Sequence, residues 1–278
     1  MTNLRGGILS VAVTALLGLV VSGCAGTTTG QGGTPATADP KAALAASTKE
    51  LINGNFAFAA AMPSGTAKGA VHLPSKSAAF TVETTGQEAM KIELVLADPD
   101  RWVRMTMDTK QLESALLTGD DSSPVAKQVK EALKLFTGKT WFHIDATKVK
   151  KGGSLDIDLT DPDLTGASGL LRAVSNVHGD AHTISGTLDA TKAASADGFL
   201  DSDTVSEMGA AAAALPFTAS LDDRGRLTKL AIDAPKAGET PAGKWTVTIT
   251  GYGEQAAQTK PTGAVTEMPA SGYQAMNG

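Results

Sequence analysis

This chain of 278 residues contains little cysteine and few aromatic residues, and it has no excess of positive charge. Its single cysteine, Cys24, allows no disulfide within the chain, so the folded part has to be stabilised by burial of apolar side chains alone. Aromatic residues make up only 4% of the sequence, and Ala, Val, Leu and Met therefore have to form most of that core.

The balance of charge excludes one class of partner. The net charge at neutral pH is −5, and removal of residues 1–23 takes away Arg5 and leaves −6. Nucleic-acid binding needs clustered Lys and Arg, so we expect no nucleic-acid partner. An acidic chain is not drawn to anionic lipid either, and attachment to a membrane has to come from a dedicated anchor.

Only one stretch of the sequence is long and strongly hydrophobic, and it lies at the N-terminus. Arg5 precedes the apolar run from Ile8 to Val21, which is too short to span a membrane and has the layout of a secretory signal peptide. The run ends in Val21-Ser22-Gly23-Cys24, which matches the lipobox of bacterial lipoproteins, whose cysteine thiol receives a diacylglycerol before cleavage. We expect residues 1–23 to be a lipoprotein signal peptide and acylated Cys24 to anchor the mature protein to the cell membrane, outside the cytoplasm. The alternative is an ordinary export signal with an incidental cysteine.

Residues 24–39 contain no large apolar side chain and are predicted to be a flexible tether with a typical reach of about 20 Å. Residues 40–278 are predicted to form one folded domain.

Within that domain, helical and alternating hydrophobic patterns follow one another. Asp39-Pro40 and Asn53-Gly54 bracket an amphipathic helix over residues 40–52. Period-two alternation predicts strands over residues 55–62, 80–84, 92–96, 102–107, 140–145, 182–190, 217–221, 227–233 and 245–249. Further helices are predicted over residues 110–117, 123–136 and 164–177, and from Thr204 to Pro216. Because no long crossovers separate the strands, this order predicts an α+β fold: a curved antiparallel sheet, or half-barrel, with helices over its concave face.

No motif indicates catalysis, and we expect the protein not to be an enzyme. The sequence lacks a Gly-x-Ser-x-Gly elbow, a His-Glu-x-x-His pair and a phosphate-binding glycine loop, and its only cysteine is the predicted acylation site. His178 and His182 would lie about 13 Å apart on a strand, too far for one metal ion. An acidic cluster departs from the calcium-binding EF-hand pattern and is better explained as turn carboxylates: Asp156, Asp158, Asp161 and Asp163. No metal or cofactor is expected.

Four side chains are predicted to point to the concave side of the sheet, because each belongs to the more apolar set of its strand: Phe58, Val82, Leu94 and Val247. Two interpretations stay open. These side chains either form an ordinary packed core or line a cavity for acyl chains. Small or flexible side chains would also suit the lining of such a cavity: Ala60, Met62, Met90, Met105 and Met107.

The C-terminal third resembles a known family. The hairpin LDDRGRLTKLAID, the strand KWTVTITGYGEQ and the earlier strand GKTWFHID, together with the lipobox and the tether, are similar to the actinobacterial LppX/LprA/LprF/LprG lipoproteins and their LolA-like relatives. The resemblance implies a half-barrel with helices over a concave face that holds acylated lipids or glycolipids. The Ala-rich helix before Pro216 and the glycines within residues 164–177 depart from that pattern.

The resemblance favours a membrane-anchored lipoprotein that binds or carries acylated lipids or glycolipids in a hydrophobic cavity at the cell envelope. Its expected partners are the lipid and the membrane, and a membrane transporter is a further partner that the sequence does not identify. The alternative is an anchored scaffold or regulatory protein whose hollow is closed by packing. A periplasmic-type solute receptor is disfavoured, because the strands and helices do not alternate.

We predict that Cys24→Ala leaves the protein without its lipid anchor and uncleaved by the lipoprotein peptidase, since acylation precedes that cut. Membrane fractionation and intact mass measure both effects. A wild-type mature mass without any acyl addition would contradict the lipoprotein assignment.

Overall fold

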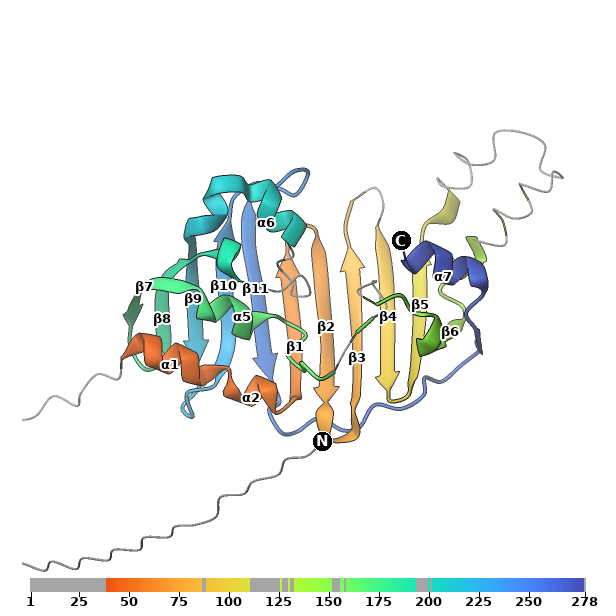
Figure 1. Cartoon of the computed structure of the whole chain (residues 1–278), viewed down its shortest axis with the longest axis horizontal. Helices are drawn as coiled ribbons and strands as arrows, with labels where there is room; N and C mark the ends of the chain where they lie inside the picture. Colours follow the sequence, from red (N-terminus) through yellow and green to blue (C-terminus); the bar gives the residue numbers. More distant parts are fainter. Residues whose placement is uncertain are drawn as a thin grey trace, which may run out of the picture. The chain divides into compact units, whose positions relative to one another are not determined.

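Twelve strands form one open, curved sheet in the computed structural model, which describes residues 39–86, 89–110, 126, 130, 133–151, 156–157, 159–193, 200 and 202–277 (Figure 1). Their order in the sheet is β12-β6-β5-β4-β3-β2-β1-β11-β10-β9-β8-β7. The strands are β1 (Asn55–Met62), β2 (Gly65–His72), β3 (Ser77–Thr84), β4 (Met90–Ala97), β5 (Asp100–Met107), β6 (Trp141–Ile144), β7 (Val174–Gly179), β8 (Thr183–Leu188), β9 (Leu215–Leu221), β10 (Leu227–Ala234), β11 (Gly243–Thr250) and β12 (Val265–Glu267).

The helices are few and short, which confirms the mixed α+β class. The α-helices are α1 (Pro40–Ser47), α2 (Lys49–Ile52), α5 (Ala167–Arg172), α6 (Ser202–Met208) and α7 (Ala270–Asn277). The 3-10 helices are η1 (Leu73–Ser75), η2 (Lys134–Phe136), η3 (Ala146–Lys148), η4 (Ala190–Lys192) and η5 (Gly209–Ala214). Among the described residues, none of the helices has the length and apolar character needed to cross a bilayer.

One side of the sheet, here called the apolar face, carries hydrophobic side chains from strand to strand. Residues directly opposite each other in paired strands point to the same side. The register therefore aligns one row across β1 to β6: Phe58, Gly69, Phe80, Leu94, Val103 and Phe142. A second row continues across β1 and β11 to β8: Ala60, Val247, Leu230, Ala219 and Ile184. The other side, the polar face, carries residues such as Lys68, Thr81 and Glu93.

A glycine is required within the first row. A Cβ atom on Gly69 would lie 2.5 Å from the Cβ of Phe80 and 3.0 Å from Cε1 of Phe58. The absence of a side chain at Gly69 therefore makes room for the side chains of Phe58 and Phe80 beside β2.

The first predicted helix is present, but it is divided into α1 and α2. Asp39 caps α1 as expected, because its Oδ1 accepts a hydrogen bond of 3.0 Å from the amide of Lys41. α1 ends at Ser47, whose hydroxyl donates a 2.8 Å hydrogen bond to the carbonyl oxygen of Leu44. Leu44 and Leu51 are fully buried and join the main hydrophobic core.

The helix predicted over residues 164–177 is wrong for its second half. Only α5 is helical, and Val174–Gly179 forms β7, which pairs with β8. The carboxylate of Asp163 accepts a 2.7 Å hydrogen bond from the amide of Ser168 and so fixes where α5 begins. Pairing with β8 then outweighs the helical pattern, because β-branched Val174 and Val177 suit a strand.

The C-terminal segment contains structure that the hydrophobic pattern does not predict. β12 and α7 lie beyond Pro261, and β12 pairs parallel to β6, so the sheet is not wholly antiparallel. The polar chain before β12 is held by hydrogen bonds to strand ends instead of by apolar contacts. The amide of Gln255 donates to Oδ1 of Asn55 at 2.9 Å, and that of Gln258 donates to Oγ of Ser77 at 2.8 Å.

The predicted hairpin over residues 217–233 is confirmed, with Phe217 opposite Ile232 and Leu221 opposite Leu227. Asp222 organises its turn by accepting hydrogen bonds from the amides of Arg224 and Arg226 at 3.0 and 2.9 Å. The guanidinium of Arg226 lies 4.7 Å from the ring centroid of Tyr252, whose hydroxyl donates to the carbonyl oxygen of Leu227 at 2.6 Å. The segments LDDRGRLTKLAID and KWTVTITGYGEQ are thus in direct contact.

Several predicted features lie outside the described residues. These are the signal peptide, Cys24 and the tether, and nearly all of the helix over residues 110–117. Of the helix predicted over 123–136, Ala126, Lys130 and Leu133 are described and helical, and residues 134–136 form η2.

The apolar face should dominate stability. Leu230 is fully buried, so Leu230→Ala should lower the free energy of unfolding by about 2–5 kcal/mol, whereas Ile52→Ala, at an exposed position, should change it by less than about 0.5 kcal/mol. Chemical denaturation measures both variants. Equal effects would show that the face assigned to Leu230 is wrong.

Candidate functional site

The four predicted cavity residues lie on the apolar face. Phe58 and Leu94 belong to the first row described above. Val82 and Val247 belong to the second, because Val82 lies opposite Ala67, Ala67 opposite Ala60, and Ala60 opposite Val247. Phe58, Leu94 and Val247 are buried and Val82 is half-buried. Their role in lining a cavity stays a prediction.

A hollow of about 440 Å³ lies where the apolar face ends, at the side of the sheet that carries η1 and the β4–β5 turn. We call it the Leu96 hollow. Its apolar walls are Leu73, Leu96, Ile157 and Leu159, and its polar lining comes from Lys76, Asp98, Asp100, Arg101 and Thr160. Its volume is within the range of about 300–1,000 Å³ typical of small-molecule sites.

Local sequence features build the walls of this hollow. η1 directly follows β2, and Lys76 ends η1 in a left-handed conformation, with φ 48° and ψ 50°. The Nζ atom of Lys76 lies 3.6 Å from Oδ2 of Asp98 in the β4–β5 turn. Leu96 is two residues beyond Leu94 on β4, so the floor of the hollow continues the apolar face.

None of the four predicted cavity residues lines the Leu96 hollow, and the sequence analysis singled out none of the residues that do as cavity residues. Two of these residues are Ile157 and Leu159. They alternate with Asp156 and Asp158 of the acidic cluster. The same alternation could have identified an extended segment with one apolar side. The combination of apolar walls and charged rim is suited to an amphiphile, whose hydrocarbon part leaves water while its polar part stays at the rim.

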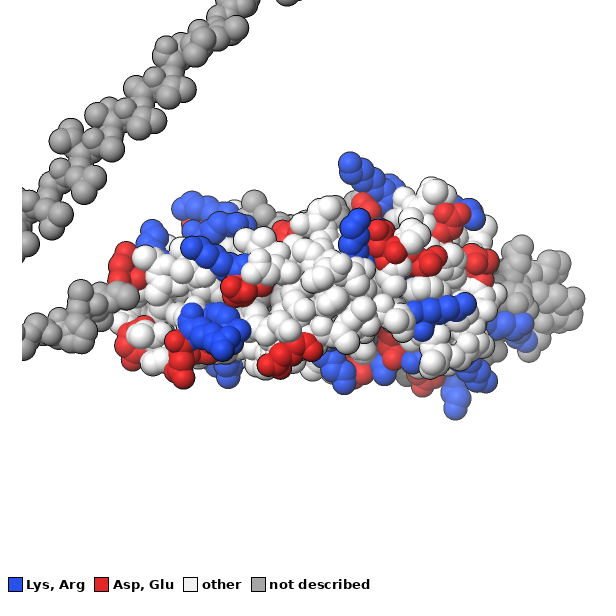
Figure 2. Space-filling view, turned by 90° about the horizontal axis from the view of Figure 1, so that it is seen from below, with Lys and Arg blue, Asp and Glu red and all other residues white. Residues whose placement is uncertain are grey.

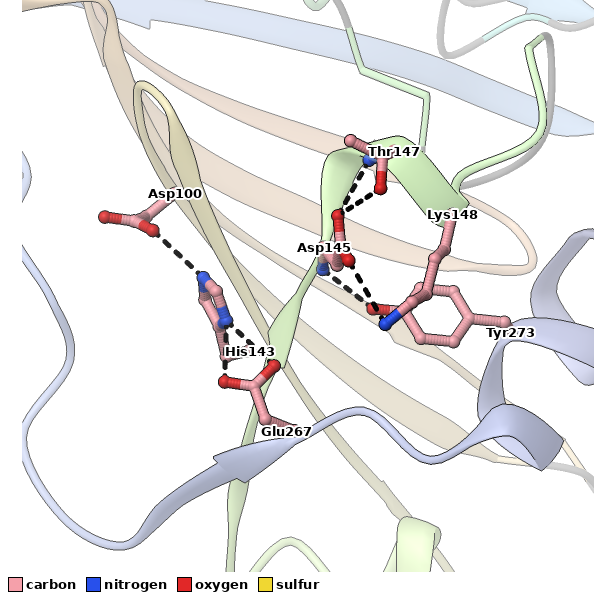
Figure 3. Close-up of polar contacts among 7 residues, drawn as sticks. All are labelled: Asp100, His143, Asp145, Thr147, Lys148, Glu267 and Tyr273. Carbon is pink, nitrogen blue, oxygen red and sulfur yellow. Dashed lines mark hydrogen bonds and ion pairs between the residues drawn. The ribbon is translucent and has the colours of Figure 1, made fainter.

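Asp100 connects the hollow to a cluster of polar residues at the C-terminal segment. Figure 3 shows His143 of β6 between Asp100 of β5 and Glu267 of β12. Nε2 of His143 lies 3.0 Å from Oδ1 of Asp100, and Nδ1 lies 3.0 Å from Oε1 of Glu267. A neutral imidazole carries one N–H, so only the imidazolium donates to both carboxylates.

The two carboxylates determine the direction of the pKa shift. Burial by itself would lower the pKa of His143, but hydrogen bonds and charge interactions with Glu267 and Asp100 outweigh it and raise the pKa above 6.5. The contact therefore contributes stability in full below the unfolded pKa of about 6.5, and that contribution is lost as the pH rises through the folded pKa.

A second contact in Figure 3 joins η3 to α7. The amide of Asp145 donates to the hydroxyl oxygen of Tyr273 at 2.7 Å, and the Nζ atom of Lys148 lies 3.1 Å from Oδ2 of Asp145. Hydrogen bonds from Thr147 and Lys148 lower the pKa of Asp145 to about 2, so this carboxylate stays charged across the physiological range. Tyr273 is buried, which fixes α7 beside β6.

Of the acidic residues 156–163, Asp161 and Asp163 organise the backbone of a turn. Oδ1 of Asp161 accepts from the amide of Asp163, and Asp163 accepts from Thr165 and Ser168. His178 and His182 lie on β7 and on the β7–β8 turn, and Nδ1 of His178 contacts the carbonyl oxygen of Asn176. Across the described parts of the chain, no group of three or more His, Cys, Asp or Glu side chains is placed to hold a metal ion.

The His143 contact predicts a pH dependence. The pKa of His143 should exceed 6.5 and should decrease in Asp100→Asn and in Glu267→Gln, because each variant removes a negative charge beside the ring. Between about pH 6 and pH 8 the wild type should lose stability relative to His143→Gln as the imidazolium is deprotonated. NMR titration of the ring and denaturation at several pH values measure these effects. A His143 pKa at or below 6.5 would contradict the geometry.

Comparisons with protein-family models, with curated proteins and with solved structures find no match to this chain. Its function therefore has to be inferred from its own residues and their geometry.

Proposed function

We propose that this protein is a membrane-anchored lipoprotein that binds acylated lipid against the apolar face of its sheet, at the extracytoplasmic side of the cell membrane. Acylated Cys24 attaches it to the membrane, and the bound lipid or glycolipid is its ligand. The protein acts as a carrier or receptor and not as an enzyme: binding removes hydrocarbon from water, and each buried CH₂ contributes about 0.8 kcal/mol.

The single observation that carries this proposal is the continuity between the Leu96 hollow and the apolar face. Leu96 and Leu94 are neighbours on the same side of β4, and Leu94 lies opposite both Phe80 and Val103. Phe80 is only half-buried although it is a large apolar residue in the middle of this face. A chain that enters at the hollow thus meets apolar side chains along several strands.

The half-barrel arrangement is part of the proposal. α1 contacts β7 and α5, and Figure 1 shows α1 and α5 beside the strands from β7 to β11. Leu44 of α1 and Leu170 of α5 belong to the same buried cluster as Ile184 and Leu230 on the apolar face. We take the apolar face as the concave one, with these helices covering its β7–β11 part and the ligand occupying the part over β1–β5.

A second function is favoured by a specific observation. Phe58, Leu94 and Val247 are buried at 8%, 4% and 0% exposure by the protein itself. A core closed in this way would suit an anchored scaffold or regulatory protein that holds no lipid. The two functions differ in whether an acyl chain binds in the Leu96 hollow: the lipid-binding protein holds one there, and the scaffold does not.

Leu159→Arg tests the lipid-binding proposal. Leu159 is half-buried on a non-strand segment, so arginine should be tolerated in the fold while placing a charge in the apolar hollow. We expect the variant to bind a fluorescent fatty acid at least about tenfold more weakly than the wild type, a loss of about 1.4 kcal/mol.

Thr187→Arg provides the matched control, because Thr187 is also half-buried but lies on the polar face, away from the hollow. It should bind the probe as the wild type does. Thermal melts confirm that both variants are folded. Absence of probe binding to the wild type would favour the scaffold instead. Equal binding by folded wild type and Leu159→Arg would show that the probe does not occupy the Leu96 hollow.

A further inference from the structure

We infer that one edge of the sheet rests on the membrane that holds the Cys24 anchor, with Ile52 as the side chain that enters the bilayer interface. This edge, called the η1 edge, consists of α1, α2, η1 and the β4–β5 turn at Asp98-Pro99. The inference rests on the proposed function, because it assigns the direction from which lipid reaches the hollow.

These elements lie together at one end of the strands. α1 and α2 run along the lower side of the sheet in Figure 1, where β2 ends in η1 and β4 ends in the turn to β5. Figure 2 views the protein from this side, and the middle of the visible surface carries neither Lys and Arg nor Asp and Glu, which lie around it. A surface with an uncharged centre can approach lipid without burying ionised groups.

Ile52 is the feature of this edge that distinguishes it from the rest of the described surface. Its exposure is 59%, and among the residues described it is the one large hydrophobic side chain that is exposed. A solitary exposed apolar residue is common on protein surfaces and is by itself no evidence of a site. Its position carries the inference.

Ile52 ends α2, two residues before a backbone contact with a wall residue of the Leu96 hollow. Two residues after it, the carbonyl oxygen of Gly54 accepts a 2.6 Å hydrogen bond from the amide of Leu73, which lines the hollow. A Cβ atom on Gly54 would lie 2.5 Å from the Cβ of Leu73 and 2.8 Å from that of Pro162, so the chain directly after α2 packs closely against η1. Insertion of Ile52 would therefore bring the hollow to the lipid surface.

The anchor joins the domain at the same edge. Asp39, which caps α1, is the first described residue, and fourteen residues lie between it and Cys24. Even when fully extended, that length spans at most about 50 Å, so the bilayer always lies within reach of α1. Covalent attachment supplies a high effective concentration, and a contact too weak to recruit the protein from solution is then enough to orient it.

The charges of the edge favour a bilayer surface in general over an anionic one in particular. Lys41 and Lys49 are exposed on α1 and α2, but Glu50 accompanies them, and Lys76 is paired with Asp98. Orientation should therefore depend little on the salt concentration, in contrast to docking by a basic patch.

Depth-dependent fluorescence quenching tests the inference on the full lipoprotein in phosphatidylcholine–phosphatidylglycerol vesicles. The Ile52→Cys variant has two cysteines, Cys24 and the new one at position 52. Because the thiol of Cys24 is acylated, a thiol-reactive fluorophore attaches only at position 52. Thr85→Cys is the matched control: it is also exposed, but it lies in the β3–β4 connection at the opposite end of β3. We expect nitroxide-bearing lipid to quench the label at position 52 several-fold more strongly than the label at position 85.

Equal quenching at both positions, stronger quenching at position 85, or no quenching at either would overturn the inference. The fatty-acid binding of the same two labelled proteins is measured in parallel. Binding without selective quenching at position 52 would leave the lipid-binding function in place and remove only the orientation, whereas selective quenching without binding would remove only the function.

Discussion

The strand register is the constraint on which the rest of the structure depends. A shift of one residue in any strand would move its apolar side chains to the opposite side of the sheet. The observed pairing instead keeps Phe58, Phe80, Leu94 and Val103 in one row, and the helices α1 and α5 share a core with that same face. The Leu96 hollow follows from this arrangement, because it forms where the apolar row reaches the end of β4 and meets Ile157 and Leu159.

Much of the sheet could be predicted from the sequence, because period-two alternation is a local signal. The hairpin at Asp222 and the sidedness of Phe58, Val82, Leu94 and Val247 follow from that alternation. β7 could not be predicted, since its pairing with β8 competes with a helical pattern in the same residues. β12 could not be predicted either, because it is three residues long and is stabilised by pairing with β6, far away in the sequence.

The candidate site was harder to predict than the fold. The four strand residues share one face of the sheet, but the hollow is lined by other residues, among them Leu73, Ile157 and Leu159, which come from connections between strands. Such residues carry a weak periodic signal, and only the tertiary structure brings them together. Asp100 was likewise unremarkable in sequence, yet it takes part both in the rim of the hollow and in the contact with His143 that secures β12. The polar contacts of the C-terminal segment therefore support the same end of the sheet that the proposed ligand would use.

The central claim is that acyl chains occupy the apolar face beyond the Leu96 hollow. Native mass spectrometry of the lipoprotein extracted from its own membrane tests this most directly, because it separates the covalent acyl groups on Cys24 from lipid held without a bond. Our account predicts an additional lipid mass at close to one molecule per protein, which disappears on denaturation while the acyl groups remain. A native mass equal to that of the acylated chain alone would contradict it and would favour a closed, packed core.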